Sequence, residues 1–171
     1  LDSSNLIDSG VHLDKFLRLW APLDRTIFNM APDEPRTIDT SFLGSTSSYR
    51  DIRKPYLDHL ESNGLNLFRS GGQLDNQLSL EEYAAIFMRS KISINFAFSV
   101  GSACQLKVRV FEILYSGALL MQSANPETKK YFIPGQDYVE FESKEDLLKK
   151  IRYYLAHDRE RLAIAKRGHE K

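Results

Sequence analysis

The chain has 171 residues, of which 42% are hydrophobic and 27% are charged, which is the balance of a globular protein with a core of its own. Its 23 basic and 23 acidic residues cancel. No overall field therefore recruits nucleic acid or an anionic membrane, and an anion-binding site would have to be local. One cysteine, Cys104, excludes a disulfide within the chain and favours a reducing compartment, the cytoplasm. No apolar run approaches the roughly 20 residues of a membrane-spanning helix.

Residues 1–37 differ in composition from the rest of the chain. Residues 11–20 predict a short amphipathic helix, and Pro22, Pro32 and Pro35 follow it closely. Proline at this density is typical of an extended linker. We therefore place a domain boundary at the end of this region, with one domain over residues 38–171.

Strands and helices alternate along residues 38–171. The expected strands are short and apolar, and they cover residues 39–44, 65–68, 92–96, 118–122 and 138–141. Helical patterns follow each of them, and two helices follow the last strand. Ser79-Leu-Glu-Glu82 has the spacing of a capping box and predicts the start of one of these helices.

The clearest unit of the chain runs from Lys107 to Gln122. Apolar residues recur with the helical period as far as Tyr115. Gly117 then ends the helix, and a short apolar run predicts a strand covered on both faces. Repeated alternation of this kind predicts an α/β fold, a Rossmann-like doubly wound parallel sheet of about five strands with flanking helices.

Ligands bind such sheets beyond the carboxyl ends of the strands, and three loops there carry candidate residues. The first contains Gly44 and Ser45, with Arg50 just beyond. Glycine lets the backbone approach a phosphate, which hydroxyls, amides and cations can bind. No Walker pattern is present, so a solvated loop is the favoured interpretation of this segment alone. In the second loop, which contains Gly71, a simple turn is favoured.

The third loop leads into the helix that carries Lys107, Arg109 and Glu112. The two cations could meet a pyrophosphate, and the carboxylate could accept hydrogen bonds from both hydroxyls of a ribose. A surface ion pair between Arg109 and Glu112, worth about 0.2–0.5 kcal/mol, is the alternative. We favour binding because an unneeded carboxylate on an otherwise apolar helix is costly. Lys107 also opposes the helix dipole unless an anion lies nearby.

Other chemistry is poorly supported by the sequence. The four histidines are isolated from one another, without the spacing of metal ligands. Cys104 has no activating neighbour in the sequence, and no Gly-x-Ser-x-Gly motif is present. Neither a metal site nor a catalytic nucleophile is therefore expected.

Several segments match a known family in their order and spacing. They are Asp39-Thr-Ser-Phe-Leu-Gly-Ser45, Leu80-Glu-Glu-Tyr83, Lys91-Ile-Ser-Ile-Asn95, Lys107-x-Arg-x-Phe-Glu-Ile-Leu-x-x-Gly-Ala118 and Tyr153-Tyr-Leu-x-His157. Together they resemble the C-terminal domain of group 1 glycosyltransferases, and most nearly the spore-maturation-protein type. Trp20-Ala-Pro-Leu-Asp24 is similar to the inter-domain linker of that family. The resemblance covers roughly residues 18–171.

The resemblance implies a GT-B enzyme, in which two Rossmann-like domains enclose a cleft. The C-terminal domain of this family binds a nucleoside diphosphate sugar, and the N-terminal domain holds the glycan, protein or small-molecule acceptor. The chain would then be a donor-binding domain of a hexosyltransferase, a type of enzyme used in polysaccharide biosynthesis. Residues 1–37 would be a linker and a remnant of a missing N-terminal domain, so the chain alone is expected to be inactive. The resemblance implies no metal and no cofactor beyond the nucleotide-sugar substrate.

The resemblance also implies roles for individual residues. Glu112 matches the second glutamate of the family's Glu-x7-Glu pattern, which binds the donor ribose. Cys104 occupies the place of the first glutamate, so the sugar and the stereochemical outcome stay open. Lys107 and Arg109, with Gly44 and Ser45, match positions near the diphosphate. Further candidates for the donor pocket are Arg50, Gly71, Cys104 and Phe111.

A non-catalytic α/β interaction or nucleotide-binding module is the alternative. In that case Arg109 and Glu112 would be structural charges. A receiver-like domain is less favoured because it needs an acidic cluster at the strand ends, and Asp39 lies at a strand start. The two interpretations differ in whether Lys107, Arg109 and Glu112 face one cleft near Gly44.

Overall fold

The computed structural model describes residues 8–10, 12–15, 23–30, 35–46, 48–71, 78–98 and 105–171. Most of the predicted helix over residues 11–20 lies outside the described residues, apart from the short 3-10 helix η1 (Leu13–Lys15). Cys104 lies outside them as well.

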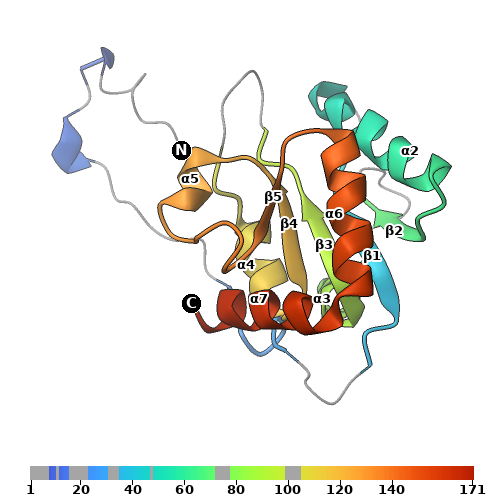
Figure 1. The fold of residues 1–171 in the computed structure, drawn as a ribbon. Coiled ribbons are helices and arrows are strands. Elements are labelled where there is room, and N and C mark those ends of the chain that lie inside the picture. Colours follow the sequence, from blue (N-terminus) through green and yellow to red (C-terminus); the bar gives the residue numbers. More distant parts are fainter. Residues whose placement is uncertain are drawn as a thin grey trace.

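Five strands form one sheet in which every neighbouring pair is parallel. The strands are β1 (Ile38–Leu43), β2 (Leu67–Ser70), β3 (Ser90–Asn95), β4 (Leu119–Ser123) and β5 (Val139–Phe141), and their order across the sheet is β2-β1-β3-β4-β5. Figure 1 shows the sheet in the middle of the domain, with the helices packed around it. The predicted Rossmann-like parallel sheet is confirmed.

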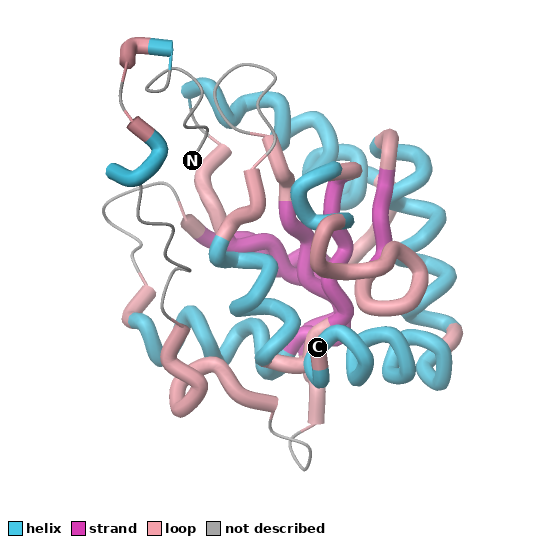
Figure 2. The backbone as a smooth tube through the Cα atoms, turned by 90° about the vertical axis from the view of Figure 1, so that its left-hand side faces the viewer, coloured by secondary structure: helices cyan, strands magenta, loops and turns pink. Residues whose placement is uncertain are grey.

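Helices connect the strands and cover both faces of the sheet (Figure 2). They are η2 (Ser48–Arg53), α2 (Lys54–Ser62), α3 (Leu80–Arg89), α4 (Val108–Tyr115), α5 (Pro126–Lys129), α6 (Lys144–Ala156) and α7 (Asp158–Glu170). Two hydrophobic clusters correspond to the two faces. One contains residues of α2 and α6, and the other contains residues of α3 and α4. Among the described residues, no helix combines the length and the apolar content that crossing a membrane requires.

The strands are apolar throughout because each face of the sheet is covered. On β4, for example, Leu119 and Met121 belong to the cluster under α2 and α6, whereas Leu120 belongs to the cluster under α3 and α4. All three side chains are fully buried. Burial of a leucine side chain contributes about 1.5–3 kcal/mol relative to exposure, so this alternation fixes the register of the strand.

The helix starts follow the local sequence closely. Ser79 accepts a hydrogen bond from the backbone N–H of Glu82 (3.1 Å), and Glu82 accepts one in return from the backbone of Ser79 (2.8 Å), so the predicted capping box is confirmed. Strand β2 begins two residues later than predicted. The reason is that the N–H of Leu65 donates to the carbonyl of Leu60 (3.1 Å) and so still closes the end of α2.

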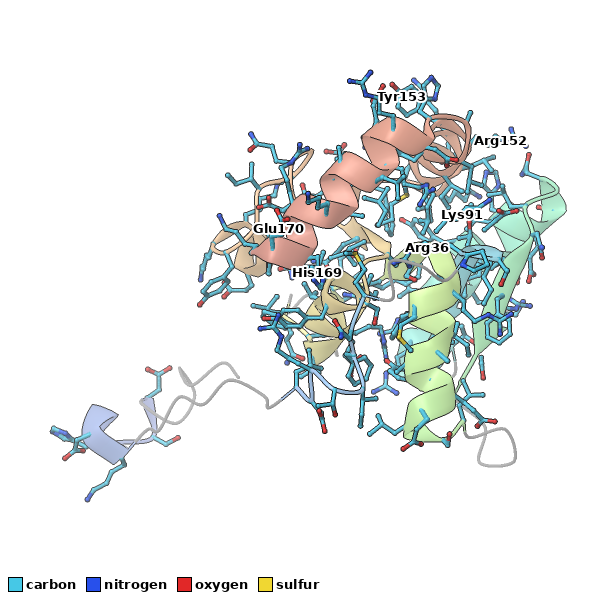
Figure 3. The ribbon with its side chains drawn as sticks, turned by 90° about the horizontal axis from the view of Figure 1, so that it is seen from below. Arg36, Lys91, Arg152, Tyr153, His169 and Glu170 are labelled. Atoms are coloured by element: carbon cyan, nitrogen blue, oxygen red, sulfur yellow. The ribbon has the colours of Figure 1, made fainter. Side chains whose placement is uncertain are left out.

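Part of the region predicted to be a linker packs against the domain. Phe28 is 4% exposed and belongs to the cluster of α3 and α4. Arg36 donates from Nη1 to the carbonyls of Ser90 (2.7 Å) and Phe87 (3.3 Å), and from Nη2 to that of Ser116 (2.8 Å). Figure 3 shows Arg36 below the sheet, on the side where α7 crosses. The division of the chain at residue 37 stays a prediction.

Candidate functional site

The sheet order places a topological switch point between β1 and β3. From β1 the chain passes to β2 at one edge of the sheet, whereas from β3 it passes through α4 to β4 on the other side. The two connections leave in opposite directions, and folds with such a switch point have a crevice there, at the carboxyl edge of the strands. That crevice is where ligands bind in folds of this order.

Gly44, directly after β1, lies against the guanidinium group of α4 at this crevice. A Cβ atom at Gly44 would lie only 3.2 Å from Nη1 of Arg109. Gly71, directly after β2, has φ of +114° and packs against the backbone of Gly44, since a Cβ at Gly71 would lie 3.0 Å from the backbone N of Gly44. Glycine at both positions therefore permits this close packing, and the positive φ of Gly71 requires it there. Three predicted site residues are therefore brought together here: Gly44 and Gly71 from two loops, and Arg109 from α4.

Arg109 and Glu112 meet at the hydroxyl of Tyr83, which α3 supplies. Arg109 Nε donates to Tyr83 Oη (3.2 Å), and Tyr83 Oη donates to Glu112 Oε2 (2.7 Å). Glu112 is only partly exposed. It therefore does not point into open solvent, and it is joined to Arg109 through Tyr83, not as the simple surface pair that the sequence left open.

Burial sets the protonation states of this group. It raises the pKa of the Glu112 carboxyl, while the hydrogen bond from Tyr83 and the charge of Arg109 act in the opposite direction. Burial, chiefly, also raises the pKa of Tyr83 to about 12. At neutral pH Tyr83 therefore keeps its proton and remains a hydrogen-bond donor to the carboxylate.

Lys107 occupies the N-cap position of α4, and its ammonium group faces the main chain that follows β3. Lys107 Nζ donates to the carbonyls of Phe98 (2.7 Å) and Phe96 (2.9 Å). The two carbonyl oxygens thus stabilise this cation beside the helix N-terminus, a role that the sequence alone attributed to a nearby anion. A contact between Lys107 and phosphate stays a prediction. No side chain caps the N-terminus of α4 at the N-cap position.

The remaining predicted residues have different surroundings. The carbonyl of Ser45 accepts a hydrogen bond from Arg53 Nη1 (2.9 Å), and Arg53 is 4% exposed. Arg50 lies in η2, just after this turn. Phe111 packs edge-on against Phe132 (5.8 Å between ring centroids). Among the described residues, no group of three His, Cys, Asp or Glu side chains is placed to hold a metal ion.

Tyr83 is the residue of this site that the sequence did not single out. In the sequence it is one of several apolar positions on the face of a predicted helix. Its hydroxyl becomes informative only when α3 and α4 are known to pack side by side. The available signal was that a buried tyrosine normally needs a partner for its hydroxyl group.

A comparison with protein families shows to which family the chain belongs. The family described as "Glycosyl transferase-like" matches residues 50–171, which is well over half of the chain. The chain belongs to this glycosyl transferase-like family. No curated protein matches the sequence of this glycosyl transferase-like domain.

Solved structures of glycosyltransferases share the fold of this domain. An α1,3-fucosyltransferase with GDP-fucose superimposes with a TM-score of 0.64 at 15% identity, over 80% of this chain and 40% of that chain. HepE from Anabaena, in complex with UDP-glucose, gives a TM-score of 0.64 at 8% identity, over 98% of this chain and 55% of that chain. The C-terminal domain of LpcC, a group 1 glycosyltransferase family protein from Francisella tularensis, gives 0.59 at 12% identity, over 87% of this chain and 95% of that domain. This chain thus spans about half the length of the first two proteins and corresponds to a single GT-B domain.

Proposed function

We propose that this domain binds the nucleoside diphosphate sugar of a glycosyltransferase, in the crevice at the carboxyl ends of β1 and β3. The observation that carries the proposal is the placement of the Arg109 guanidinium against Gly44, with Glu112 one helical turn away. A cation and a carboxylate at this separation suit a diphosphate and the neighbouring ribose. The carboxylate offers two acceptors to two hydroxyl groups, and the guanidinium donates to phosphate oxygens.

In this proposal each element of the crevice has one role. Glu112 binds the ribose hydroxyls. Arg109 and the N-terminal amides of α4, which the side chain at the N-cap position does not cap, bind the diphosphate, since helix N-termini favour anions. Gly44 and Gly71 leave room for the backbone to approach the ligand. Such groups would stabilise the leaving diphosphate by positioned charge without a bound metal ion.

Several finer points belong to the same proposal. The fold neighbours whose structures contain GDP-fucose and UDP-glucose support a nucleotide-sugar donor. The shared Lys-x-Arg and Phe-Glu-Ile-Leu residues support the spore-maturation-protein-like subgroup. The protein that contains this domain would transfer a hexose to a glycan, protein or small acceptor, for example in polysaccharide biosynthesis. The single cysteine supports a cytoplasmic location.

Transfer itself would need more than this chain. The chain spans 40% of the fucosyltransferase and 55% of HepE, so the acceptor side of the cleft would come from a second domain. We therefore expect the isolated chain to bind a nucleotide with little transferase activity. Sugar transfer by the purified chain at ordinary enzymatic rates would contradict this part of the proposal.

Calorimetric titration of the chain with UDP, GDP and ADP tests the donor site. One of the three should bind, and both Glu112→Ala and Arg109→Met should weaken that binding at least about tenfold, because each removes charge-assisted hydrogen bonds. The matched control is Glu170→Ala, an exposed glutamate in the last turn of α7 (labelled in Figure 3), which should bind as the wild type does. Absence of binding at millimolar concentration, from a folded chain, would favour the non-catalytic interaction module.

A further inference from the structure

We propose that Tyr83 is a positioning residue of the donor site. Its hydroxyl group ties Arg109 to Glu112, so that the diphosphate-binding and ribose-binding side chains act as one unit. The inference rests on the proposed function, and it adds a residue outside the loops that enclose the ligand.

The hydroxyl of Tyr83 uses its donor and its acceptor capacity at once. It donates to Glu112 Oε2 (2.7 Å) and accepts from Arg109 Nε (3.2 Å). With Nε engaged in this way, Arg109 is held with its Nη1 group beside Gly44. With one lone pair of Oε2 engaged, the other lone pair of Oε2 and the second oxygen of Glu112 are left for a ligand. One hydroxyl therefore sets the direction of both charged groups.

The ring of Tyr83 is itself held in place. It meets the ring of Phe87 edge-on at 4.9 Å and that of Phe28 edge-on at 6.1 Å between centroids. Both phenylalanines are at most 4% exposed. The capping box at Ser79 and Glu82 fixes the start of the helix from which the ring projects. A ring packed on two sides gives its hydroxyl a well-defined position.

The hydrogen bonds of Tyr83 with both charged side chains would strengthen ligand binding by ordering those side chains in advance. Arginine and glutamate are long side chains that lose rotamer freedom when a ligand orders them, and this loss weakens binding. A hydroxyl that orders them beforehand removes part of the loss. The alternative is a purely structural hydrogen bond that satisfies a half-buried tyrosine. The two roles differ in whether removal of the hydroxyl changes how the site distinguishes a ribose.

The first test is Tyr83→Phe, which keeps the ring and removes only the hydroxyl. The probes are UDP, GDP and ADP and their 2′,3′-dideoxy forms, which lack the ribose hydroxyls. The wild type should prefer one ribonucleotide to its dideoxy form. In Tyr83→Phe the affinity for that ribonucleotide should fall about tenfold, and most of the preference for ribose should disappear. The matched control is Tyr153→Phe at the corner between α6 and α7, which loses a similar tyrosine–glutamate hydrogen bond to Glu160 (2.9 Å) but should keep wild-type binding.

The pH dependence of binding gives a second measurement, because it reports on the proton of Glu112 at the proposed ligand position. Among the described residues, Tyr83 from α3 and Arg109 from α4 are the groups that act electrostatically on Glu112. Without the hydroxyl donor, the pKa of Glu112 should rise further. Binding by Tyr83→Phe should therefore begin to weaken at a higher pH than binding by the wild type. Titration of the nucleotide phosphate is common to both proteins and cancels in the comparison.

A variant at the other end of the tie keeps the test independent of how Tyr83→Phe folds. Glu112→Gln replaces the charged acceptor of Tyr83 by a neutral one. If the three side chains act as one unit, this change should weaken binding of the dideoxy nucleotide severalfold, although that ligand has no hydroxyl for Glu112 to bind. Unchanged dideoxy affinity in Glu112→Gln would overturn the inference.

The outcomes separate the inference from the proposed function. If the folded wild-type chain binds none of the three nucleotides, the proposed function fails and the inference fails with it. If the wild type binds one of them, while folded Tyr83→Phe keeps the same affinity, ribose preference and pH profile, the inference is overturned and the donor site stands. If Tyr83→Phe loses the ribose preference and Tyr153→Phe does not, the inference is supported.

Discussion

Replacement of Gly44 by alanine should separate ligand binding from stability. The added Cβ would lie 3.2 Å from Arg109 Nη1, 3.2 Å from Phe42 Cζ and 3.5 Å from Arg109 Cζ. The two 3.2 Å separations are shorter than the roughly 3.5–4.0 Å at which carbon atoms pack best. The guanidinium and the ring must therefore each move by a few tenths of an ångström. The displaced cation faces the proposed diphosphate position.

The expected size of both effects follows from this geometry. Overpacking of this mild kind should lower the free energy of unfolding by about 1 kcal/mol, which is a fall in Tm of about 2–4 °C for a chain of this length. A shift of the guanidinium weakens a charge-assisted hydrogen bond that is worth about 1.5–3 kcal/mol. Loss of about 1 kcal/mol of it would raise the Kd for the nucleoside diphosphate about fivefold.

Gly64→Ala is the matched control for this experiment. Gly64 has φ of +79°, and a Cβ there would meet no atom within 4 Å, so alanine should cost about 1–2 kcal/mol through backbone strain alone. Thermal melts and calorimetric titration of the two variants should show similar stability losses, with weaker binding in Gly44→Ala only. Wild-type affinity in Gly44→Ala, or an equal loss of affinity in Gly64→Ala, would refute the reasoning.

Four further predictions concern charge and packing. Nucleotide binding should weaken as the pH falls from neutral towards the raised pKa of Glu112, because burial raises that pKa and the ribose needs the carboxylate. Titrations should show that Glu112→Gln lacks this component. The free energy of unfolding should depend on pH in the opposite direction. Because the pKa of Glu112 is raised in the folded state, its contribution to stability is full below the unfolded-state pKa and is lost as the pH rises through the native pKa. Denaturation at neutral pH should therefore find Glu112→Gln no less stable than the wild type. Arg36→Met removes three hydrogen bonds to carbonyls and should cost about 3 kcal/mol, whereas Arg25→Met, which loses only a guanidinium stacked 4.8 Å from the Tyr115 ring centre, should cost less than about 1 kcal/mol; equal melting temperatures would contradict this. Gly168→Ala should destabilise the fold by about 2 kcal/mol or more despite the better helix propensity of alanine, because the new Cβ would lie 2.3 Å from the carbonyl oxygen of Asp137; a more stable variant in denaturant would show that α7 shifts freely.

The sequence predicted the fold well because its signals were local. The capping box at Ser79 satisfies its own helix, and the glycine at position 117 adopts the left-handed conformation (φ +70°) expected after the last turn of α4. Distant contacts add a second reason for that glycine that no local pattern contains. A Cβ at Gly117 would lie 2.7 Å from Arg36 Nη2 and 2.7 Å from Met30 Cγ.

The site was predictable only in part, because the sequence signals are local and the site depends on contacts between distant residues. Arg109 and Glu112 stand out in the sequence because they are charged residues on an apolar helix, and Gly44 stands out because it ends a strand. The partner that joins the two charges, Tyr83, comes from a different helix and depends on tertiary packing. Lys107 shows the converse, since its charge is locally conspicuous but is directed at the carbonyls of Phe96 and Phe98.

The burial of Phe28 has a consequence for where this domain can be shortened. Its ring belongs to the buried cluster of α3 and α4 and contacts the ring of Tyr83, and Leu23 and Ile27 pack against the same cluster, so this segment is part of the domain. A shortened chain that begins at residue 35 would uncover the aromatic face of α3, and with it the support of the residue that orders the proposed donor site.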